Sequence, residues 1–205
     1  MPGEVGKGLQ VGVLALQGSV MEHVQCLQKI PGIDIIQVRK PQQLSGIDGI
    51  ILPGGESTTM GKLARELGIL EPLRELIQDG LPVWGTCAGM ILLARNIVQQ
   101  DDVHLGLLDV TLRRNAYGGQ LDSFSRTAVI EKIAPHEIPL IFIRAPYIEQ
   151  WGREVEVLLE LEGKAVAVKQ GNILATSFHP ELTDDLSTHR YFIRKIEQSL
   201  LRLYL

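Results

Sequence analysis

The sequence predicts a three-layer α/β fold, in which a mostly parallel central sheet carries helices on both faces and continues into an antiparallel extension. The first observation is that short, continuously apolar runs alternate with segments of helical periodicity over residues 10–95, as in right-handed strand–helix–strand crossovers. The second is that short strands separated by polar or glycine-bearing turns follow from residue 109 onward, which is typical of antiparallel strands. No linker-like stretch interrupts the chain, so we expect one domain over residues 1–205.

Composition limits the classes of function. The 205 residues are 45% hydrophobic and 21% charged, and 20 basic against 24 acidic residues give a net charge of −4. This negative balance argues against a surface for nucleic acid or for an anionic membrane. No apolar run reaches transmembrane length and the start of the chain lacks the apolar core of a secretion signal, so we expect a cytoplasmic protein.

The first part of the chain predicts three strands and an amphipathic helix. Residues 10–16 are too continuously apolar for a strand with one wet face, so the first strand should be buried on both sides. Ser19 and Glu22 have the spacing of a capping box, which predicts a helix that stops before Pro31. Two further strands are expected at residues 34–38 and 50–52.

The third strand leads into a glycine loop and two more helices. Ser57 or Thr58 can cap a helix after this loop, and Gly68 stands where a glycine just beyond the helix would end it. Another helix is expected at residues 71–78, before an apolar strand that ends at Trp84.

Beyond the parallel region, the sequence predicts strands joined by tight turns and a closing helix. Glu162-Gly163 and Gln170-Gly171-Asn172 are turn signals, so the last three strands should form an antiparallel meander. The segment from about residue 185 to residue 203 has an apolar stripe at helical spacing. The strands expected in this half cover residues 109–112, 127–131, 140–143, 155–161, 165–168 and 173–177.

Cys87 is the candidate nucleophile. It lies where a buried strand passes directly into a helix, with Gly85 and Gly89 two residues to either side. A sharp strand-to-helix turn would crowd any Cβ at those two positions, and the resulting Gly-x-Cys-x-Gly pattern is the thiol counterpart of the nucleophile elbow. The helix N-terminus that follows favours a thiolate over a thiol. The alternative is a buried, inert cysteine, which the flanking glycines disfavour; Cys26, on the first expected helix, is interpreted as packing.

A thiol nucleophile needs a base, and His179 is the candidate among the five histidines because it follows directly after a buried strand. In an extended segment residues i and i+2 point the same way, so Glu181 can reach the far ring nitrogen of His179. This predicts a catalytic triad of Cys87, His179 and Glu181. Neither the histidines nor the two cysteines have the spacing of a zinc site, and we expect no metal.

The loop Pro53-Gly54-Gly55 invites comparison with a phosphate-binding loop, but the glycine and hydroxyl positions of that motif are occupied by Glu56 and Leu63. A better role is an oxyanion hole made by the N–H groups of Gly55 and Ala88. Both glycine-bearing stretches follow parallel strands, and such strands present their carboxyl ends at one edge of the sheet. We therefore expect the loop and Cys87 to face one crevice.

Three stretches together resemble the class I (triad) glutamine amidotransferases. They are Gly-Thr-Cys-Ala-Gly-Met around Cys87, Leu-Pro-Gly-Gly-Glu-Ser-Thr-Thr-Met from Leu52, and Phe-His-Pro-Glu-Leu around His179. Within that family, the segment from Gly12 to Gly18, the pair Glu22-His23 and Phe-Ile-Arg-Ala-Pro at residues 142–146 are similar to the glutaminase subunits of pyridoxal 5'-phosphate synthase.

The resemblance implies hydrolysis of the glutamine side-chain amide through a thioester on Cys87, without a cofactor. The ammonia would pass to a separate synthase subunit, a TIM barrel, in a hetero-oligomer. Free glutamine carries an α-carboxylate and an α-ammonium, which call for oppositely charged partners at fixed positions. The glutamine contacts implied by the resemblance are Gly55, Glu56, Ser57, Arg114, Ile143 and Arg144.

Alternatives remain at this point. The chain could be the glutaminase of another ammonia-using synthase, such as that of histidine biosynthesis, or a non-catalytic protein on a related fold in which Cys87 senses redox state. Arg114 and Arg144 could be solvated loop arginines. Gly119, in Tyr117-Gly118-Gly119-Gln120, departs from the family pattern, which leads us to expect an arginine before the glutamine.

Overall fold

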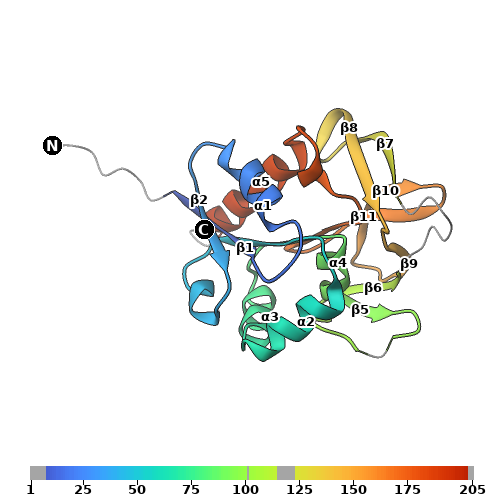
Figure 1. Ribbon diagram of the computed structural model, residues 1–205. Helices are drawn as coiled ribbons and strands as arrows, with labels where there is room; N and C mark the ends of the chain where they lie inside the picture. Colours follow the sequence, from blue (N-terminus) through green and yellow to red (C-terminus); the bar gives the residue numbers. More distant parts are fainter. Residues whose placement is uncertain (1–7, 101, 115–122, 203–205) are drawn as a thin grey trace.

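The computed structural model describes residues 8–100, 102–114 and 123–202. Its main feature is a ten-stranded mixed sheet in the order β2-β1-β3-β4-β12-β11-β9-β6-β5, with β10 added beside β11 (Figure 1). Strands β1 to β4 and β12 run parallel to one another, whereas β11 is antiparallel to β12, β10 and β9. The strands of this sheet are β1 (Leu9–Leu14), β2 (Ile33–Val38), β3 (Gly49–Leu52), β4 (Val83–Thr86), β5 (Ala94–Ile97), β6 (Leu108–Arg113), β9 (Tyr147–Trp151), β10 (Glu156–Leu161), β11 (Lys164–Gln170) and β12 (Ile173–Thr176).

Helices cover both faces of the parallel half. In Figure 1, α1 and α5 lie above the sheet and α2, α3 and α4 lie below it, which gives the three layers expected from the sequence. The prediction of an α/β fold with an antiparallel extension is confirmed. The helices are α1 (Val20–Gln28), α2 (Ser57–Glu66), α3 (Leu70–Gln78), α4 (Ala88–Leu93) and α5 (Ser187–Arg202), with short 3₁₀ turns η1 (Pro41–Leu44) and η2 (Pro180–Leu182).

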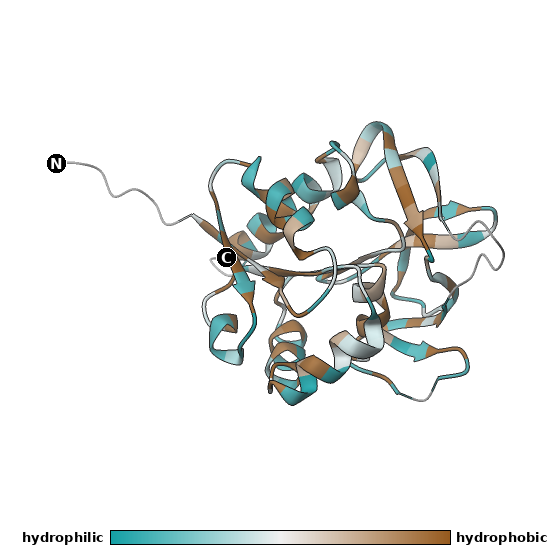
Figure 2. Cartoon of the chain, in the orientation of Figure 1, coloured by the Kyte–Doolittle hydropathy of each residue, from teal (hydrophilic) through white to brown (hydrophobic). Residues whose placement is uncertain are grey.

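The parallel strands are buried on both sides, and alternate residues face different cores. In β3, Ile50 and Leu52 pack among the residues of α2, α3 and α4, whereas Ile51 packs on the opposite face with α1 and α5. Val83 and Trp84 of β4 divide in the same way. Figure 2 shows these strands as a largely brown band between helices that are teal on their outer faces.

A separate two-stranded sheet packs against the antiparallel half. Strands β7 (Ser123–Ile130) and β8 (Ala134–Ile143) form a hairpin whose inner face joins a third apolar cluster. Phe142 is fully buried there, stacked on Phe124 with ring centroids 4.6 Å apart and edge-on to Phe178 at 5.9 Å. Because Phe178 precedes His179, this aromatic cluster helps to fix the end of β12.

Two predictions of helix caps, for α1 and for α2, are wrong. Ser19 occupies the N-cap position of α1 but makes no capping hydrogen bond, because its hydroxyl donates to the carboxylate of Glu181 instead. Helix α2 is capped neither by Ser57 nor by Thr58. The Glu56 carboxylate takes that role by accepting hydrogen bonds from the N–H groups of Thr58 and Thr59. Gly68, with φ of 69°, follows the last turn of α2 as expected.

Two strands had no sequence prediction. β5 follows α4 without an intervening loop, and β9 lies between β6 and β11. The antiparallel pairing of β10, β11 and β12 confirms the expected meander. No helix within residues 8–100, 102–114 and 123–202 is long and apolar enough to cross a membrane. The departure at Gly119 lies outside the described residues.

The turn from β4 into α4 requires both glycines around Cys87. A Cβ on Gly85 would come 2.5 Å from the backbone of Gly89. A Cβ on Gly89 would overlap the carbonyl oxygen of Leu52 in β3. Cys87 itself has φ of 47° and ψ of −101°, a strained conformation for a non-glycine residue. The elbow predicted from the sequence is therefore present, and neighbouring backbone segments hold it.

We expect Gly89→Ala to lower the free energy of unfolding by more than about 3 kcal/mol, because a backbone carbonyl cannot move aside as a flexible side chain can. Gly46→Ala is the control. Unlike Gly89, Gly46 has a positive φ, 80°, but no atom lies within 4 Å of its would-be Cβ, so only backbone strain of about 1–2 kcal/mol applies. Urea unfolding of both variants measures the difference, and equal losses would contradict the steric explanation.

Candidate active site

Cys87 lies at the carboxyl end of β4, where the main chains of two strands meet. Its N–H donates to the carbonyl oxygen of Thr176 in β12, at 2.8 Å. Its Sγ lies 3.9 Å from the carbonyl oxygen of Ile143, at the end of β8. The thiol is therefore placed by backbone contacts to two segments that lie more than 50 residues away in the sequence.

His179 and Glu181 follow β12, the strand next to β4 in the sheet. The Nδ1 of His179 is 2.8 Å from Oε1 of Glu181, and both side chains are almost fully buried. Burial disfavours the charged imidazolium, but hydrogen bonds with Cys87 and Glu181 outweigh it and raise the pKa of His179 to about 10. The expected contact of Glu181 with the ring of His179 is present, but residues 180–182 form the 3₁₀ turn η2 rather than the extended segment expected from the sequence.

Glu181 is a buried carboxylate that stays ionised. Burial alone would raise its pKa, yet the neighbouring His23 and His179 and the hydroxyl of Ser19 lower it to about 2. Ser19 Oγ donates to Oε1 at 2.6 Å, and His23 Nε2 lies 3.5 Å from Oε2. Sequence reasoning missed both partners, although Ser19 and His23 stand four residues apart and so share one face of a helix.

The glycine loop packs closely against both the histidine and the turn before α1. A Cβ on Gly54 would overlap the ring of His179, and a Cβ on Gly55 would come 2.5 Å from the side-chain oxygen of Gln17. The carbonyl oxygen of Gly54 accepts a hydrogen bond from the N–H of Ser19 at 2.9 Å. The two glycines are thus required by close approach, independently of any role in binding an oxyanion.

Glu56 and Arg114 form a polar wall beside the loop. The Glu56 carboxylate caps α2 and lies 3.3 Å from Nη2 of Arg114. Burial opposes ionisation of Glu56, but the Thr59 and Thr58 N–H groups and Arg114 lower its pKa to about 2. Arg114 also donates to Gln100 Oε1 at 2.9 Å. Arg114 is therefore held in a defined position, which disfavours its reading as a freely solvated loop arginine.

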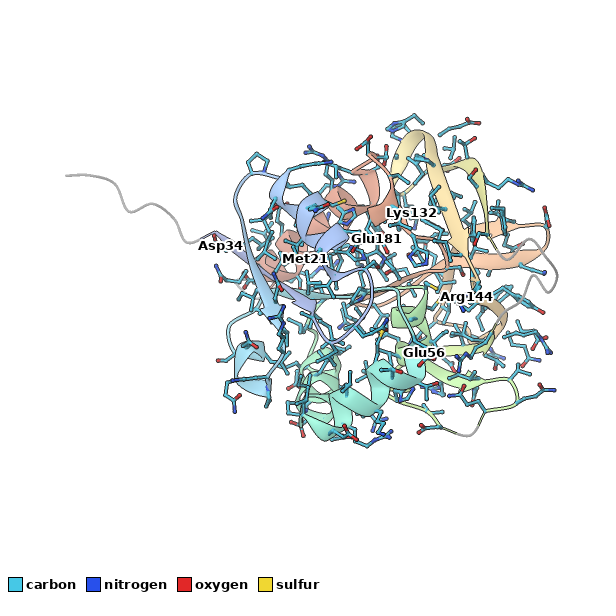
Figure 3. The ribbon with its side chains drawn as sticks, viewed as in Figure 1. Met21, Asp34, Glu56, Lys132, Arg144 and Glu181 are labelled. Carbon is cyan, nitrogen blue, oxygen red and sulfur yellow. The ribbon has the colours of Figure 1, made fainter. Side chains whose placement is uncertain are left out.

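These residues surround one cavity of about 360 Å³. Figure 3 labels Glu56 and Arg144, which line this cavity, and Glu181, which does not line it and lies nearer to α1 in the view. The side chain of Arg144 is exposed, and its backbone has a positive φ of 42°. The hydroxyl of Ser57 is buried and has no hydrogen-bond partner among the described residues. The sequence-predicted residues that line the cavity are Gly55, Glu56, Ser57, Cys87, Arg114, Ile143, Arg144 and His179, and Gln17, Gly18, Ser19, Gly54, Ile91 and Leu182 are added by the structure.

The arrangement can activate a thiol. An imidazole that contacts the thiol can take its proton, and a buried carboxylate behind the ring stabilises the resulting imidazolium. Ala88, whose N–H was expected to contribute to an oxyanion hole, is buried and is the first residue of α4. The cavity offers a carboxylate and two guanidinium groups within one small space, which suits a substrate that carries both charges.

Comparison with known proteins decides the family. Residues 13–198 match the SNO glutamine amidotransferase family. The chain belongs to this family. The curated relatives include pyridoxal 5'-phosphate synthase subunit PdxT of Clostridium kluyveri, 52% identical over 185 residues that make up 90% of this chain and 98% of the relative. PdxT of Thermoanaerobacter sp. (strain X514) is 50% identical over 186 residues, 91% of this chain and 98% of that relative.

A solved structure supports the same assignment. It is a crystal structure of a glutamine amidotransferase that is 46% identical to this chain, superimposes with a TM-score of 0.87, and covers 93% of this chain and 100% of its own. The resemblance stated from the motifs is thereby confirmed. The high identity to subunits of pyridoxal 5'-phosphate synthase favours a chain of that type over the glutaminase of histidine biosynthesis.

The two pKa shifts predict a pH-dependent contribution to stability. The pKa of Glu181 is below its unfolded value of ~4.3, so its contribution is present above that pH and is lost as pH falls towards about 2. The pKa of His179 is above its unfolded value of ~6.5, so its contribution is present below that pH and is lost as pH rises towards about 10. We expect the difference in unfolding free energy between wild type and Glu181→Gln to be greatest at about pH 4.5–6.5 and to decrease on both sides.

Urea unfolding from pH 3 to pH 10 measures this difference. The exposed Glu160 of β10 offers a control, because Glu160→Gln removes one charge from the same chain without touching the buried site. If the difference in unfolding free energy between wild type and Glu181→Gln stays constant across this range, the buried ion pair is not the source of the pH dependence of stability.

Proposed function

We propose that this protein is the glutaminase subunit of a pyridoxal 5'-phosphate synthase and hydrolyses L-glutamine to L-glutamate and ammonia. The observation that carries the proposal is that His179, held 2.8 Å from Glu181, and Cys87 line one cavity with charges of both signs. Family membership and the names of the relatives support it. The cytoplasmic location expected from the sequence stays a prediction.

The reaction follows from the positions of three side chains. With the proton held on His179, the Cys87 sulfur attacks the side-chain amide carbon of glutamine, and a carbon–sulfur bond forms. The imidazolium gives its proton to the departing nitrogen, the carbon–nitrogen bond breaks, and ammonia and a thioester result. Water, deprotonated by the same imidazole, then attacks the thioester, which releases glutamate and returns the proton to the Cys87–His179 pair. Glu181 orients the ring and stabilises its charged form.

Two backbone N–H groups complete the proposed site. Those of Gly55 and Ala88 would bind the oxygen that becomes negatively charged when Cys87 attacks. In the same proposal, Glu56 and Ser57 bind the α-ammonium end of glutamine, and Arg114 and Arg144 the α-carboxylate. Ile143 contributes its main chain, because its carbonyl already faces the thiol.

The ammonia has to reach an acceptor before water protonates it. The relatives are named as synthase subunits, and we propose that a TIM-barrel synthase subunit binds this chain in a hetero-oligomer and receives the ammonia. No cofactor takes part in the glutaminase step.

We expect Cys87→Ala to abolish glutamine hydrolysis while the paired synthase still forms product from added ammonium salt. Cys26→Ala is the matched control, because Cys26 is the other cysteine of the chain and is also buried. The glutaminase activity of Cys26→Ala should stay within about twofold of wild type. His179→Asn should lose nearly all turnover. Glu181→Gln should lose less, because Glu181 acts only by orienting the His179 ring. Glutaminase activity that persists in Cys87→Ala would refute the assignment.

We also expect the isolated chain to be a poor glutaminase that the synthase activates. Glycine has no Cβ that restricts rotation of the Gly54–Gly55 peptide, but rotation must first break the hydrogen bond from the Ser19 N–H to the Gly54 carbonyl oxygen. Contact with the synthase would turn the Gly55 N–H towards the developing oxyanion. Without this donor, the free subunit loses about 3 kcal/mol of transition-state stabilisation, which slows turnover on the order of a hundredfold. The measurement is the rate of glutamine hydrolysis as a function of synthase concentration. A rate that is already maximal without the synthase, and that does not change as synthase is added, would contradict this prediction.

A further inference from the structure

His23 is a buried titratable group that the proposed reaction does not use. It lies on α1, one helical turn after Ser19, and is fully buried. Its Nε2 is 3.5 Å from Glu181 Oε2 and 3.3 Å from Thr86 Oγ1, and its Nδ1 is 3.1 Å from Nε2 of His189 on α5. It therefore connects the carboxylate of the triad to a second layer of polar side chains.

The two oxygens of Glu181 have different surroundings. Oε1 receives the Ser19 hydroxyl and the His179 ring nitrogen, at 2.6 and 2.8 Å. Oε2 is buried, and no hydrogen bond reaches it among the described residues. An unpaired carboxylate oxygen in a low-dielectric interior is costly, so a donor that points at it has a large effect. His23 Nε2 is the ring nitrogen that faces this oxygen.

The arrangement of the two imidazoles selects one tautomer of His23. Burial lowers the pKa of His23, and burial together with the neighbouring His23 lowers that of His189 to about 3, so both rings are neutral. One of them must donate across the 3.1 Å contact. If His23 donated, its bare Nε2 would face the carboxylate, and His189 would bury an N–H at Nδ1, which has no partner. If His189 donates, the His23 Nε2–H can donate to Thr86 Oγ1 at 3.3 Å and lies beside Glu181 Oε2 at 3.5 Å, and only the lone pair on His189 Nδ1 is left unpaired.

We propose that neutral His23, protonated at Nε2, is a positioning residue that holds the second carboxylate oxygen of Glu181 and thereby the ring of His179. Ser19 and His23 then fix both oxygens of one carboxylate from a single face of α1. With a donor beside Oε2 at 3.5 Å, rotation of the carboxylate about its last bond is opposed, so Oε1 stays directed at Nδ1 of His179. Trp84 packs edge-on to both His23 and His189, at 5.4 and 5.0 Å between ring centroids, and keeps their planes in place.

The tautomer can be measured without any variant. Long-range proton–nitrogen NMR spectra of the full chain, labelled with ¹⁵N at histidine, report which ring nitrogen carries the proton. The His23 signals are assigned by comparison with His23→Gln. We expect one neutral ring protonated at Nε2 near pH 7. Protonation at Nδ1, or at both nitrogens, would overturn the proposal.

A pair of amide variants tests the effect on turnover. His23→Gln places an amide N–H near the position of Nε2, whereas His23→Asn places one near Nδ1, directed at His189 rather than Glu181. With the cognate synthase present, His23→Leu and His23→Asn should lower kcat about 10- to 100-fold and leave KM for glutamine within about threefold. His23→Gln should recover most of kcat. Equal losses in the Gln and Asn variants, or a loss that appears in KM alone, would refute the positioning role.

Phe192→Leu is the control for packing, because Phe192 is fully buried on α5 and contacts Trp84 in the same cluster. It should lower the melting temperature without the specific loss of kcat, and a fall in kcat as large as that of His23→Leu would also refute the role. The inference rests on the proposed function, but the two fail differently. A wild-type complex without glutaminase activity would refute the function, whereas an active wild type with unchanged His23 variants would refute only the inference.

Discussion

The contact between His179 and Glu181 is the interaction on which the candidate site depends. A carboxylate in the protein interior loses most of its hydration, and only a close cation and directed hydrogen bonds can offset that loss. Glu181 has a 2.8 Å contact to His179 and a 2.6 Å contact to Ser19. The consequence is reciprocal, because the contact with His179 that lowers the pKa of the carboxyl also raises the pKa of the imidazole. The thiol of Cys87 is thus paired with a ring that favours its protonated form.

Backbone packing gives this ion pair its fixed frame. The glycine loop after β3 approaches His179 and the turn before α1 so closely that side chains do not fit, and Gly89 approaches β3 in the same way. The carboxyl ends of the neighbouring parallel strands β3, β4 and β12 therefore lie close together at the site. Most of these contacts are between main chains or between a main chain and a ring, and the approach of Gly55 to the Gln17 side chain is the exception.

The sequence predicted most of what depends on local pattern. The apolar runs identified the parallel strands because both faces are buried, and Cys87 could be recognised because its two glycines have a local steric cause. Ser19 was misread as a cap because its sequence context is that of a capping box, while its actual partner, Glu181, is 162 residues away. β5 was missed because its middle residues, Arg95 and Asn96, are exposed and polar. Pairings of this kind arise from tertiary contact, which one sequence without its fold does not reveal.

The place of β12 in the sheet has a consequence for folding. β12 is formed by residues 173–176 yet lies directly beside β4, between the parallel and antiparallel halves. During synthesis, β4 therefore has an open edge until the C-terminal part of the chain has emerged, and such long-range pairing is slow to form. His179 and Glu181 arrive together with that strand. The nascent chain thus carries an unactivated thiol, and the base joins it only in the step that closes the sheet.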